Sequence, residues 1–453
     1  MKANIFREYD IRGIVDQEIT EDDVLTLGRA AGTYMARRGV KRITLGRDCR
    51  LSSDRFHDRM LEGLTSTGLE VVDVGVCPTP LLYYSVWHLK ADGGVMITAS
   101  HNPPEYNGFK ILVGKSTIYG QQIQELRRVA EEGRFLSGRG RHLVEDVVGP
   151  YQDEVAGIIR IEGPVKVAVD GGNGTAGPVV VPLLTRLGVE VVPLFCEMDG
   201  RFPNHEPDPT VLENLKDLQA AVTGQGLVAG LGFDGDSDRL GVVDEKGQPV
   251  WGDMLLTIFA RHNLQEVPGA TFIAEVKCSK NLFDDITARG GKAIMWKAGH
   301  SLIKQKMAET GALLAGEMSG HLFFKHRWYG FDDAIYAACR FCELLARDRR
   351  PLSTWLADLP RMVSTPEIRV DTPDEIKFQV VARVKEALAG EYQVVDVDGV
   401  RVTFPDGWGL VRASNTQPAL VLRFEAESEQ RLQEIRALVE GAIERAKAEL
   451  AGA

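Results

Sequence analysis

Cysteine is scarce in this sequence, since a chain of 453 residues contains only six. So few cysteines in so long a chain do not form the disulfide framework of a small secreted domain. The one close pair, Cys339 and Cys342, lies in a segment with helical periodicity, so we expect both thiols inside one helix. No second CxxC completes a zinc site, which favours a core role over metal or redox chemistry.

Long apolar runs and an excess of positive charge are also missing. The stretch "MKANIFREYDIRG" has no apolar core of signal-peptide length, and no later apolar run reaches bilayer length without a charge. We therefore expect a cytoplasmic protein without a membrane partner. The net charge of -11 argues against a nucleic-acid partner, so an anionic ligand has to be held by a few placed cations.

The chain contains three segments with the same order of strand, polar loop, helix, glycine and strand. They begin at "RITLGRDCR", "VKVAVDGGNG" and "TFIAEVKCSKN". Each segment continues to another apolar strand that ends in a polar loop, in "GVMITASHNP", "LVAGLGFDGDSDR" and "ALLAGEMSGHLFF". The sequence therefore predicts one α/β domain repeated three times, over residues 1–148, 149–250 and 251–362. Equivalent strand ends in such sheets carry functional loops, so three domains can direct three loops at one cleft.

The remaining residues, 363–453, have a different pattern that predicts a small α+β domain. A helical stretch near "DEIKFQVVARVKEALAG" precedes a hairpin with Asp398 and Gly399 at its turn, further strands and a charged final helix. The loop "RASNTQP" between two of these strands offers a cation with hydroxyl and amide donors. That combination suits a phosphate.

The loop "FDGDSDRLGVVDE" has carboxylates at alternate positions, Asp234, Asp236 and Asp238. Clustered like charges need a cation among them, and oxygen ligands favour Mg²⁺ or Ca²⁺ over zinc. Glu245 falls at the twelfth position of an EF-hand pattern, but the sixth is Arg239 rather than glycine, and both flanks look like strands. A catalytic Mg²⁺ loop is favoured over an EF-hand or a solvated acidic turn.

The stretch "VKVAVDGGNGTAGPVVVPLL" contains Gly172, Gly174 and Gly177 in G-x-G-x-x-G spacing, with Glu197 near the end of the next strand. This pattern is typical of a dinucleotide site, which keeps an NAD-dependent dehydrogenase as an alternative. The sister repeats have "GRDCR" and "VKCSKN" at this place. The glycines are therefore interpreted as one variant of a shared strand-to-helix turn.

The loop "GEMSGHLFF" places Glu317, Ser319 and His321 at alternate positions. In extended backbone these side chains project to one side, where they could bind sugar hydroxyls and carry a proton. The competing interpretation is a surface loop whose polar groups are hydrogen-bonded and have no further role.

Ser100 follows an apolar strand in "MITASHNPPEYNGFK". A bare serine is a poor nucleophile, and no G-x-S-x-G elbow surrounds it. His101 is its neighbour in sequence, so we expect the His101 side chain to point elsewhere. A serine that cycles through a phosphoester, opposite a divalent cation, accounts for both the serine and the carboxylates.

Taken in order, "FREYDIRG", "TASHNPPEYNGFK", "FDGDSDR", "GEMSGH" and "RASNTQP" resemble the α-D-phosphohexomutases over nearly the full length, and most closely the bacterial phosphomannomutase/phosphoglucomutase group. The resemblance implies three similar α/β domains with mixed sheets plus a C-terminal α+β domain, arranged around a central active-site cleft. It also implies an isomerase that interconverts hexose 1-phosphate and hexose 6-phosphate of mannose or glucose, through a phosphoserine, Mg²⁺ and a hexose 1,6-bisphosphate.

By motif, the resemblance implies that Ser100 is the phosphoserine and that Asp234, Asp236 and Asp238 hold Mg²⁺ together with a phosphoserine oxygen. The further catalytic residues implied are Arg12, Lys110 as a candidate acid/base, Arg239 and His321 as a proton-handling group. The substrate contacts implied are Tyr9, Lys277, His300, Glu317, Ser319, His321, Arg412, Ser414, Asn415 and Thr416.

The expected partners are phosphorylated hexoses, and the expected state is a monomer. Glucosamine-specific relatives show "QSGH"-like and "RxSGTEP"-like loops, whereas this chain has "EMSGH" and "RASNTQP". These departures favour mannose and glucose over a phosphoglucosamine mutase. A metal-dependent sugar phosphatase and a non-catalytic sugar-phosphate-binding protein remain alternatives from other classes.

Overall fold

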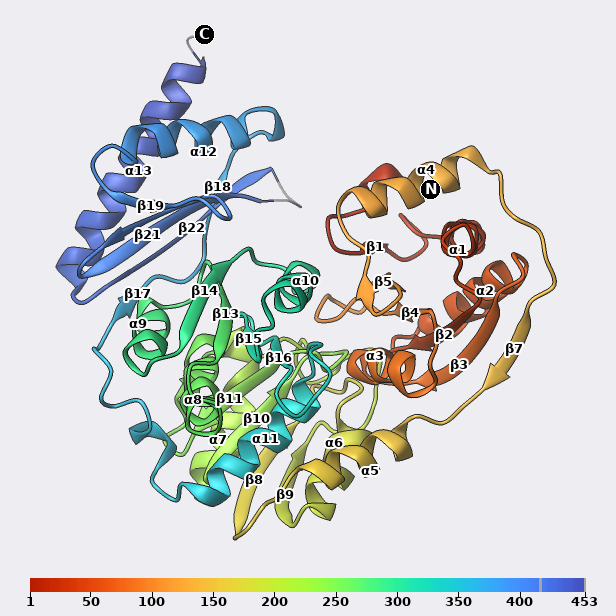
Figure 1. Cartoon of the computed structure of the whole chain (residues 1–453), viewed down its shortest axis with the longest axis horizontal. Coiled ribbons are helices and arrows are strands. Elements are labelled where there is room, and N and C mark those ends of the chain that lie inside the picture. The colour runs from red at the N-terminus through yellow and green to blue at the C-terminus, as the bar shows by residue number, and fades with distance from the viewer. Residues whose placement is uncertain (415–417, 452–453) are drawn as a thin grey trace. The chain divides into compact units, whose positions relative to one another are not determined.

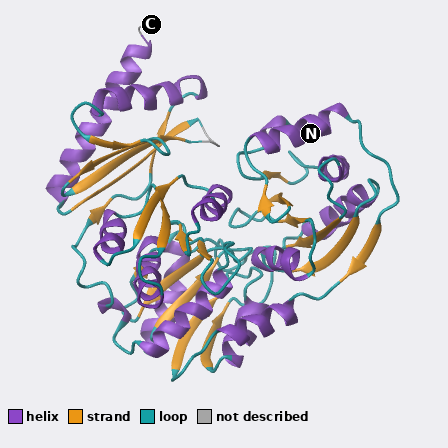
Figure 2. Cartoon of the chain, viewed as in Figure 1, coloured by secondary structure: helices purple, strands orange, loops and turns teal. Residues whose placement is uncertain are grey.

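The computed structural model describes residues 1–414 and 418–451 (Figure 1; Figure 2). The chain divides into two compact units. The first consists of Met1–Leu255 and Ser319–Trp355, and the second of Leu256–Met318 and Leu356–Ala453. Each unit has its own strands and its own apolar core. The finer division into four domains stays a prediction.

The N-terminal part of the first unit folds around a mixed sheet. Its elements are η1 (Ala3–Ile5), β1 (Ile11–Ile14), α1 (Glu21–Ala36), β2 (Arg42–Arg47), α2 (Ser53–Thr65), β3 (Glu70–Val76), α3 (Thr79–His88), β4 (Gly93–Ile97), β5 (Tyr106–Val113), β6 (Ser116–Thr117), α4 (Gln121–Glu132) and β7 (Arg141–Val144). The strand order is β1-β5-β4-β2-β3-β7, with β6 paired to β5. Strands β4, β2, β3 and β7 are parallel, whereas β5 is antiparallel to both β1 and β4.

The rest of the first unit contains a second mixed sheet. Its elements are α5 (Val148–Ile158), β8 (Val165–Asp170), α6 (Gly177–Arg186), β9 (Val189–Leu194), η2 (Leu212–Leu215), α7 (Lys216–Gln225), β10 (Ala229–Phe233), β11 (Leu240–Asp244), β12 (Pro249–Val250), β16 (Leu322–Phe324), α11 (Ala334–Arg347) and η3 (Leu352–Thr354). The strand order is β12-β11-β10-β8-β9. Strands β10, β8 and β9 are parallel, and β11 is antiparallel to β10 and β12.

The chain passes into the second unit within α8 (Gly252–Glu266). This unit contains β13 (Thr271–Glu275), α9 (Lys280–Ala288), β14 (Lys292–Trp296), α10 (His300–Thr310), β15 (Leu314–Gly316), β17 (Val363–Ser364), β18 (Ile368–Asp371), α12 (Asp374–Leu388), β19 (Gln393–Val395), β20 (Val400–Phe404), β21 (Gly407–Ala413), β22 (Ala419–Ala426) and α13 (Glu429–Ala451). β14, β13 and β15 lie side by side and are parallel. The C-terminal sheet is antiparallel, in the order β17-β22-β21-β20-β19 with β18 also on β22.

The predicted repeat is confirmed by the strand order. In each copy the first strand is central, giving β3-β2-β4, β9-β8-β10 and β14-β13-β15. The C-terminal α+β part is also confirmed, with Asp398 and Gly399 in the turn between β19 and β20. The fold class is therefore the predicted one, while the arrangement of the domains around one cleft stays a prediction.

Apolar alternation in the strands and one apolar face on each helix produce the cores that hold the strand ends in place. In the first sheet, Leu45, Val95 and Phe109 are buried and pack in one cluster with Leu27 of α1 and Leu64 of α2. α1 and α2 pack against each other along this sheet (Figure 1). The loops predicted to be functional follow β4 at Ile97, β10 at Phe233 and β15 at Gly316, at equivalent strand ends of the repeat.

Cys339 and Cys342 lie inside α11 and are buried, as predicted. Burial raises the pKa of the Cys342 thiol to about 12, so it stays protonated and packs as a small apolar side chain. Among the described residues, no helix combines the length and the apolar character that a membrane span requires.

Candidate active site

Ser100 occupies a strained turn directly after β4. Its φ is +52°, a left-handed conformation that is unfavourable by roughly 1–2 kcal/mol for a residue with a side chain. The Ser100 N–H donates to Thr98 Oγ1 at 2.9 Å, and Ser100 Oγ donates to Asp234 Oδ2 at 2.8 Å. Such strain persists only where neighbouring contacts hold it, and it is common at functional sites.

The His101 side chain does not point away from Ser100, so this expectation is wrong. His101 Nδ1 lies 3.1 Å from Ser100 Oγ. Adjacent side chains diverge in extended backbone, but the left-handed Ser100 interrupts that alternation. Burial, together with the positive charges of Arg239 and Arg12, lowers the pKa of His101 well below its ordinary value of 6.5. His101 is therefore a neutral imidazole at neutral pH.

The loop between β10 and β11 presents three carboxylates that have no exposure to solvent: Asp234, Asp236 and Asp238. Asp234 Oδ1 accepts the N–H groups of Asp238 at 3.0 Å and Arg239 at 3.1 Å, which fixes the turn. Both flanks are strands, as the argument against an EF-hand required. Burial and the charges of the other two aspartates raise the pKa of Asp234 well above its ordinary value.

Lys110, on β5, lies among these carboxylates. Its Nζ is 2.7 Å from Asp236 Oδ2 and 2.6 Å from Asp238 Oδ2. Burial alone would lower the pKa of Lys110, but the charges of Asp236 and Asp238 raise it well above its ordinary value. Thr79 Oγ1 also donates to Asp236 Oδ2, at 2.6 Å. Lys110 is thus a permanently charged ammonium in this cluster.

The same carboxylates fit a divalent cation. Oδ1 of Asp236 and Oδ1 of Asp238 are buried, and neither accepts a hydrogen bond from the residues that the structure describes. Buried carboxylate oxygens almost always have a partner. The ligand atoms of Asp234, Asp236 and Asp238 lie within 4.8 Å of one another. An all-oxygen set of this kind suits a hard cation such as Mg²⁺.

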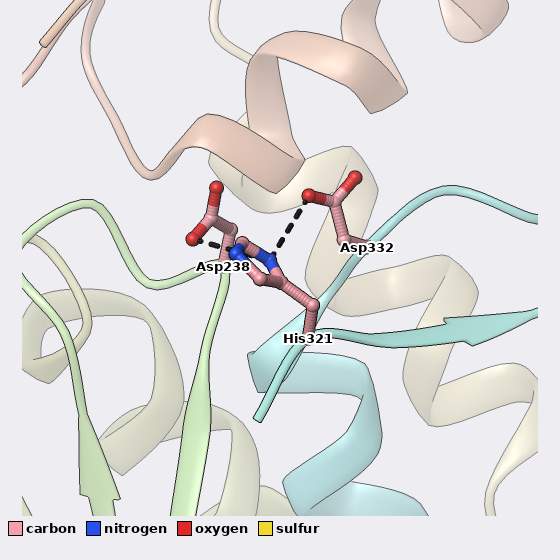
Figure 3. Close-up of side chains that lie close together, drawn as sticks. All are labelled: Asp238, His321 and Asp332. Atoms are coloured by element: carbon pink, nitrogen blue, oxygen red, sulfur yellow. Dashed lines mark ion pairs between the residues drawn. The ribbon is translucent and has the colours of Figure 1, made fainter. Parts of the chain in front are cut away.

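A second group, Asp238, His321 and Asp332, is also close enough to surround a metal (Figure 3). His321 Nδ1 lies 3.3 Å from Asp332 Oδ2 and 3.6 Å from Asp238 Oδ1. However, Arg239 Nε donates to His321 Nε2 at 3.0 Å, so Nε2 is the acceptor and the ring proton sits on Nδ1. A protonated Nδ1 cannot ligate a metal. This group is therefore an imidazole that accepts a hydrogen bond from Arg239 and lies between two carboxylates.

The segment 317–321 is not extended, so the expectation from its alternating positions is wrong. Residues 318 and 319 form a turn, and Gly320 has a φ of +93°. Side chains two residues apart share a face only in a strand. Within the first unit, the turn allows the Leu240 N–H to donate to the Gly320 carbonyl at 3.1 Å and brings His321 opposite Arg239. Ser319 is half-buried in this turn.

The glycines of the dinucleotide-like pattern have a packing role. A Cβ on Gly174 would lie 2.6 Å from the Gly235 carbonyl oxygen, and a Cβ on Gly177 would lie 1.9 Å from the Cys196 carbonyl oxygen. The Thr175 N–H also donates to the Gly235 carbonyl, at 3.1 Å. The glycine turn thus supports the aspartate loop 234–238 by direct backbone contact, which explains the glycines without a dinucleotide.

The second unit contains a separate group of predicted site residues. Glu317 Oε1 accepts the Gly299 N–H at 2.6 Å, immediately before His300 opens α10. Lys277 Nζ lies 3.6 Å from Glu275 Oε1. Burial raises the pKa of Glu275, while Lys277 and Arg412 lower it and Glu317 raises it, which shows that these charges are close together.

Arg412 is held at the edge of this group by a turn of the C-terminal sheet. Its Nη2 lies 3.3 Å from Asp398 Oδ2, which also accepts the Ala298 N–H at 3.2 Å. Ser414 is buried, and its N–H donates to the Ala419 carbonyl at 2.9 Å. The predicted residues Asn415 and Thr416 lie outside the described residues.

Arg12 and Tyr9 are the predicted site residues at the start of the first unit. Arg12, on β1, donates to Asn102 Oδ1 and to Asp10 Oδ2. Tyr9 lies in the bend before β1 and is half-buried. The first unit therefore brings Ser100 together with the three aspartates, Lys110, Arg239 and His321.

Several residues that contact the predicted site residues or their loops were missed in the sequence. They are Arg50, Thr79, Glu275, Asp332 and Asp398. Arg50 and Glu275 did have a signal in the sequence. They belong to "GRDCR" and "AEVKCSKN", which lie at equivalent strand ends of the first and third repeats, where functional polar residues are common. The contact of Thr79 with Asp236 depends on packing between distant segments, which no local pattern reports.

Comparison with known proteins agrees with this geometry. Family models described as phosphoglucomutase/phosphomannomutase match the chain in four parts: alpha/beta/alpha domain I at residues 3–136, domain II at 150–247, domain III at 251–363 and the C-terminal domain at 367–442. A phosphomannomutase/phosphoglucomutase of Pseudomonas aeruginosa is 48% identical over 437 residues, covering 96% of this chain and 94% of that protein.

Two further proteins extend the comparison. A phosphoglucomutase of Neisseria gonorrhoeae is 45% identical over 446 residues, covering 97% of both chains. A crystal structure of a phosphoglucomutase/phosphomannomutase family protein from Burkholderia thailandensis superposes with a TM-score of 0.94 at 42% identity, covering 99% of this chain and 98% of that one. The chain therefore belongs to the phosphoglucomutase/phosphomannomutase family of the α-D-phosphohexomutases.

Proposed function

We propose that this chain is an isomerase that interconverts hexose 1-phosphate and hexose 6-phosphate, with mannose or glucose as the sugar. Family membership and relatives named phosphomannomutase/phosphoglucomutase at 48% identity support the mutase activity. The observation that supports the mechanism is Ser100 Oγ, held 2.8 Å from one of three buried aspartates. A strained serine beside a cation site suits a phosphoryl carrier better than a hydrolase nucleophile.

In the proposed reaction, a phosphoryl group esterified to Ser100 passes to the free hydroxyl of a bound hexose phosphate. The bond from phosphorus to Ser100 Oγ breaks and a bond to the sugar oxygen forms. The sugar hydroxyl loses its proton and Ser100 Oγ gains one. The resulting hexose 1,6-bisphosphate turns over and returns its other phosphoryl group to Ser100 by the reverse steps.

Phosphoryl transfer depends mainly on alignment and charge neutralisation. Mg²⁺ held by Asp234, Asp236 and Asp238 would neutralise charge on the transferring group. Lys110 is protonated, so it can offer a positive charge to the phosphoryl oxygens. Neutral His101, at 3.1 Å from Ser100 Oγ, is placed to exchange a proton with that oxygen.

The group in the second unit supports sugar and phosphate recognition. Glu317 offers a carboxylate for sugar hydroxyls, while Lys277 and Arg412 offer positive charge to the phosphate that is not reacting. His300 and Ser414, and the predicted Asn415 and Thr416, would complete these contacts. Ser319, which belongs to the first unit, is proposed as a further sugar contact. Both phosphate positions must be accepted in turn, because the bisphosphate reverses during the cycle.

The first test is Ser100→Ala in the full chain. We expect turnover of glucose 1-phosphate to fall to background, because the phosphoryl carrier is removed, while binding of the sugar phosphate is retained. The measurements are product formation, sugar phosphate binding by calorimetry and the intact mass after incubation with glucose 1,6-bisphosphate. Ser137→Ala is the matched control, since Ser137 is exposed in the loop before β7. Full turnover by Ser100→Ala would disprove the assignment.

The substrate is tested by parallel assays with mannose, glucose and glucosamine 1-phosphates. We expect the first two to be isomerised and the third to be turned over more slowly. Release of inorganic phosphate in place of isomerised sugar would identify a phosphatase instead. The cytoplasmic location, the monomeric state and the role of the bisphosphate as activator remain proposals from the sequence.

A further inference from the structure

Arg50 lies in the polar loop after β2, and its side chain has 0% exposure to solvent. It belongs to "GRDCR", the strand-end loop of the first repeat, to which the proposed function assigns no role. A buried guanidinium needs an acceptor for each of its five N–H groups, because an unpaired buried charge is strongly unfavourable.

All five N–H groups of Arg50 have acceptors. Nε donates to Asp48 Oδ2 at 3.1 Å, and the four N–H groups of Nη1 and Nη2 donate to backbone carbonyls. These carbonyls belong to Ser100 at 2.8 Å, Asn102 at 2.6 Å, Pro103 at 2.7 Å and Tyr106 at 3.0 Å. One guanidinium therefore holds the whole loop 100–106 through its backbone.

The position of Arg50 is itself fixed. Asp48 Oδ1 accepts the Arg50 N–H at 3.0 Å and the Ser53 hydroxyl at 2.6 Å, so the carboxylate cannot turn away. The Phe202 ring covers the guanidinium, with its centroid 5.0 Å from Arg50 Cζ. With every donor used and the side chain enclosed, Arg50 has no free group to offer a substrate.

The carbonyl of Ser100 is fixed from two directions. Arg50 Nη2 donates to it, and the backbone of Gly235 lies so close that a Cβ there would be 2.5 Å from the same oxygen. Ser100 has a φ of +52°, a conformation that its surroundings must maintain. Fixing the carbonyl fixes the peptide plane, and with it the direction in which Oγ leaves the backbone toward Asp234.

We propose that Arg50 is a positioning residue for phosphoryl transfer, which holds the loop 100–106 so that Ser100 Oγ stays aligned with the metal-loop aspartates. Arg50 acts through Ser100 and contacts neither the sugar nor the transferring group. The inference rests on the proposed function of Ser100 as the phosphoryl carrier.

The test compares Arg50→Lys and Arg50→Met in the full chain. The measurements are kcat and KM for glucose 1-phosphate, and the rate at which glucose 1,6-bisphosphate phosphorylates Ser100, followed by intact mass. For Arg50→Met we expect kcat and the phosphorylation rate to fall about 10²-fold, the effect of misplacing a reacting group by about 1 Å, with KM within about twofold. Arg50→Lys should recover part of the loss, since an ammonium keeps the charge but donates from a single nitrogen.

A purely structural role predicts a different result. In that case the variants would lower Tm and the folded fraction, while kcat per folded molecule would equal that of the unaltered chain, and the proposal would be overturned. A rise in KM with unchanged kcat would also overturn it, because Arg50 would then act on substrate binding. If Arg50→Met does not fold, Asp48→Asn provides the second variant, with a smaller fall in kcat at constant KM.

The matched control is Arg55→Lys, since Arg55 is a partly exposed arginine of α2 that pairs with Asp16 at 2.7 Å. Its kcat and KM should be unchanged. The outcome of Ser100→Ala separates this inference from the proposed function. An active Ser100→Ala variant defeats the proposed function, whereas an inactive one beside a fully active Arg50→Met variant defeats only the role of Arg50.

Discussion

The cluster around Ser100 in the first unit and the group around Glu317 and Arg412 in the second unit are held in different ways. In the first, buried charged side chains bind one another, as Lys110 does with Asp236. In the second, acidic side chains accept backbone N–H groups, while Arg412 keeps 12% and Lys277 15% of the side chain exposed.

This difference indicates how each region responds to change. The stability of a buried cluster of charges depends on their balance, so one substitution disturbs all members of the cluster. A group anchored on the backbone keeps its shape when one cation is removed and loses only that cation's contact with the ligand. We therefore expect substitutions in the first region to act on kcat and those in the second to act on KM.

The largest effect is expected for Asp236→Asn. The change removes a negative charge that binds Lys110 and could hold Mg²⁺, so kcat should fall about 10²- to 10³-fold, as when one preorganised electrostatic contact is lost. The Mg²⁺ concentration for half-maximal activity should rise. The measurement is kcat per folded molecule across a magnesium titration.

Asp217→Asn is the control for Asp236→Asn, because Asp217 is exposed in the first turn of α7. It should leave both the rate and the magnesium curve unchanged. An unaltered magnesium curve for Asp236→Asn would show that the metal loop has been misassigned, and the contrast between the two regions would lose its basis.

A smaller effect is expected for Arg412→Ala. Loss of a charged hydrogen bond to phosphate is worth about 1.5–3 kcal/mol, which corresponds to a rise in KM of about 10- to 150-fold. The change in kcat should be smaller than the change in KM, because the Asp398 anchor to Ala298 remains. Steady-state kinetics with glucose 1-phosphate measure both.

Arg436→Ala serves as the control for Arg412→Ala, since Arg436 forms a half-exposed pair with Glu440 on α13. It should leave KM unchanged. If Arg412→Ala lowered kcat and left KM alone, the second region would behave like the first and the comparison would fail.

The smallest effect is expected for Gly399→Ala, which tests the backbone anchor of the second region. Gly399 has a φ of +85°, and a Cβ there would lie 2.4 Å from the Val411 carbonyl oxygen, next to Arg412. We expect the free energy of unfolding to fall by about 1–3 kcal/mol, with a modest rise in KM. Urea denaturation measures the free energy of unfolding.

Gly390→Ala is the matched control for Gly399→Ala, because a Cβ at Gly390 has no neighbour within 4 Å. Its free energy of unfolding should be nearly unchanged. Equal stability of the two variants would mean that the turn at Asp398 yields to the added methyl group and does not anchor Arg412.

The sequence predicts much of the first region because its signals are local. Three equivalent strands, each followed by a polar loop, indicate that Ser100 and the aspartates follow β4 and β10, and both placements are confirmed. The helix around Cys339 and Cys342 and the turn at Gly399 have equally local causes, namely helical periodicity and an Asp-Gly pair.

The predictions that failed depend on backbone angles that the sequence does not reveal. His101 lies against Ser100 because Ser100 is left-handed, which is rare for serine. The alternation argument at Glu317 and His321 assumed extended backbone, where the chain forms a turn. Thr79 was missed because its partner, Asp236, belongs to a segment far away in the sequence.

Gly174, Gly235 and Ser100 form a stack of main chains with no room for a side chain between them. The spacing of this stack is set by covalent geometry and van der Waals radii, which do not vary between rotamers. The stack therefore fixes the depth at which the Ser100 hydroxyl lies. A larger residue at either glycine would have to displace the neighbouring main chain, so a change at one position would alter the other two, although they are remote along the chain.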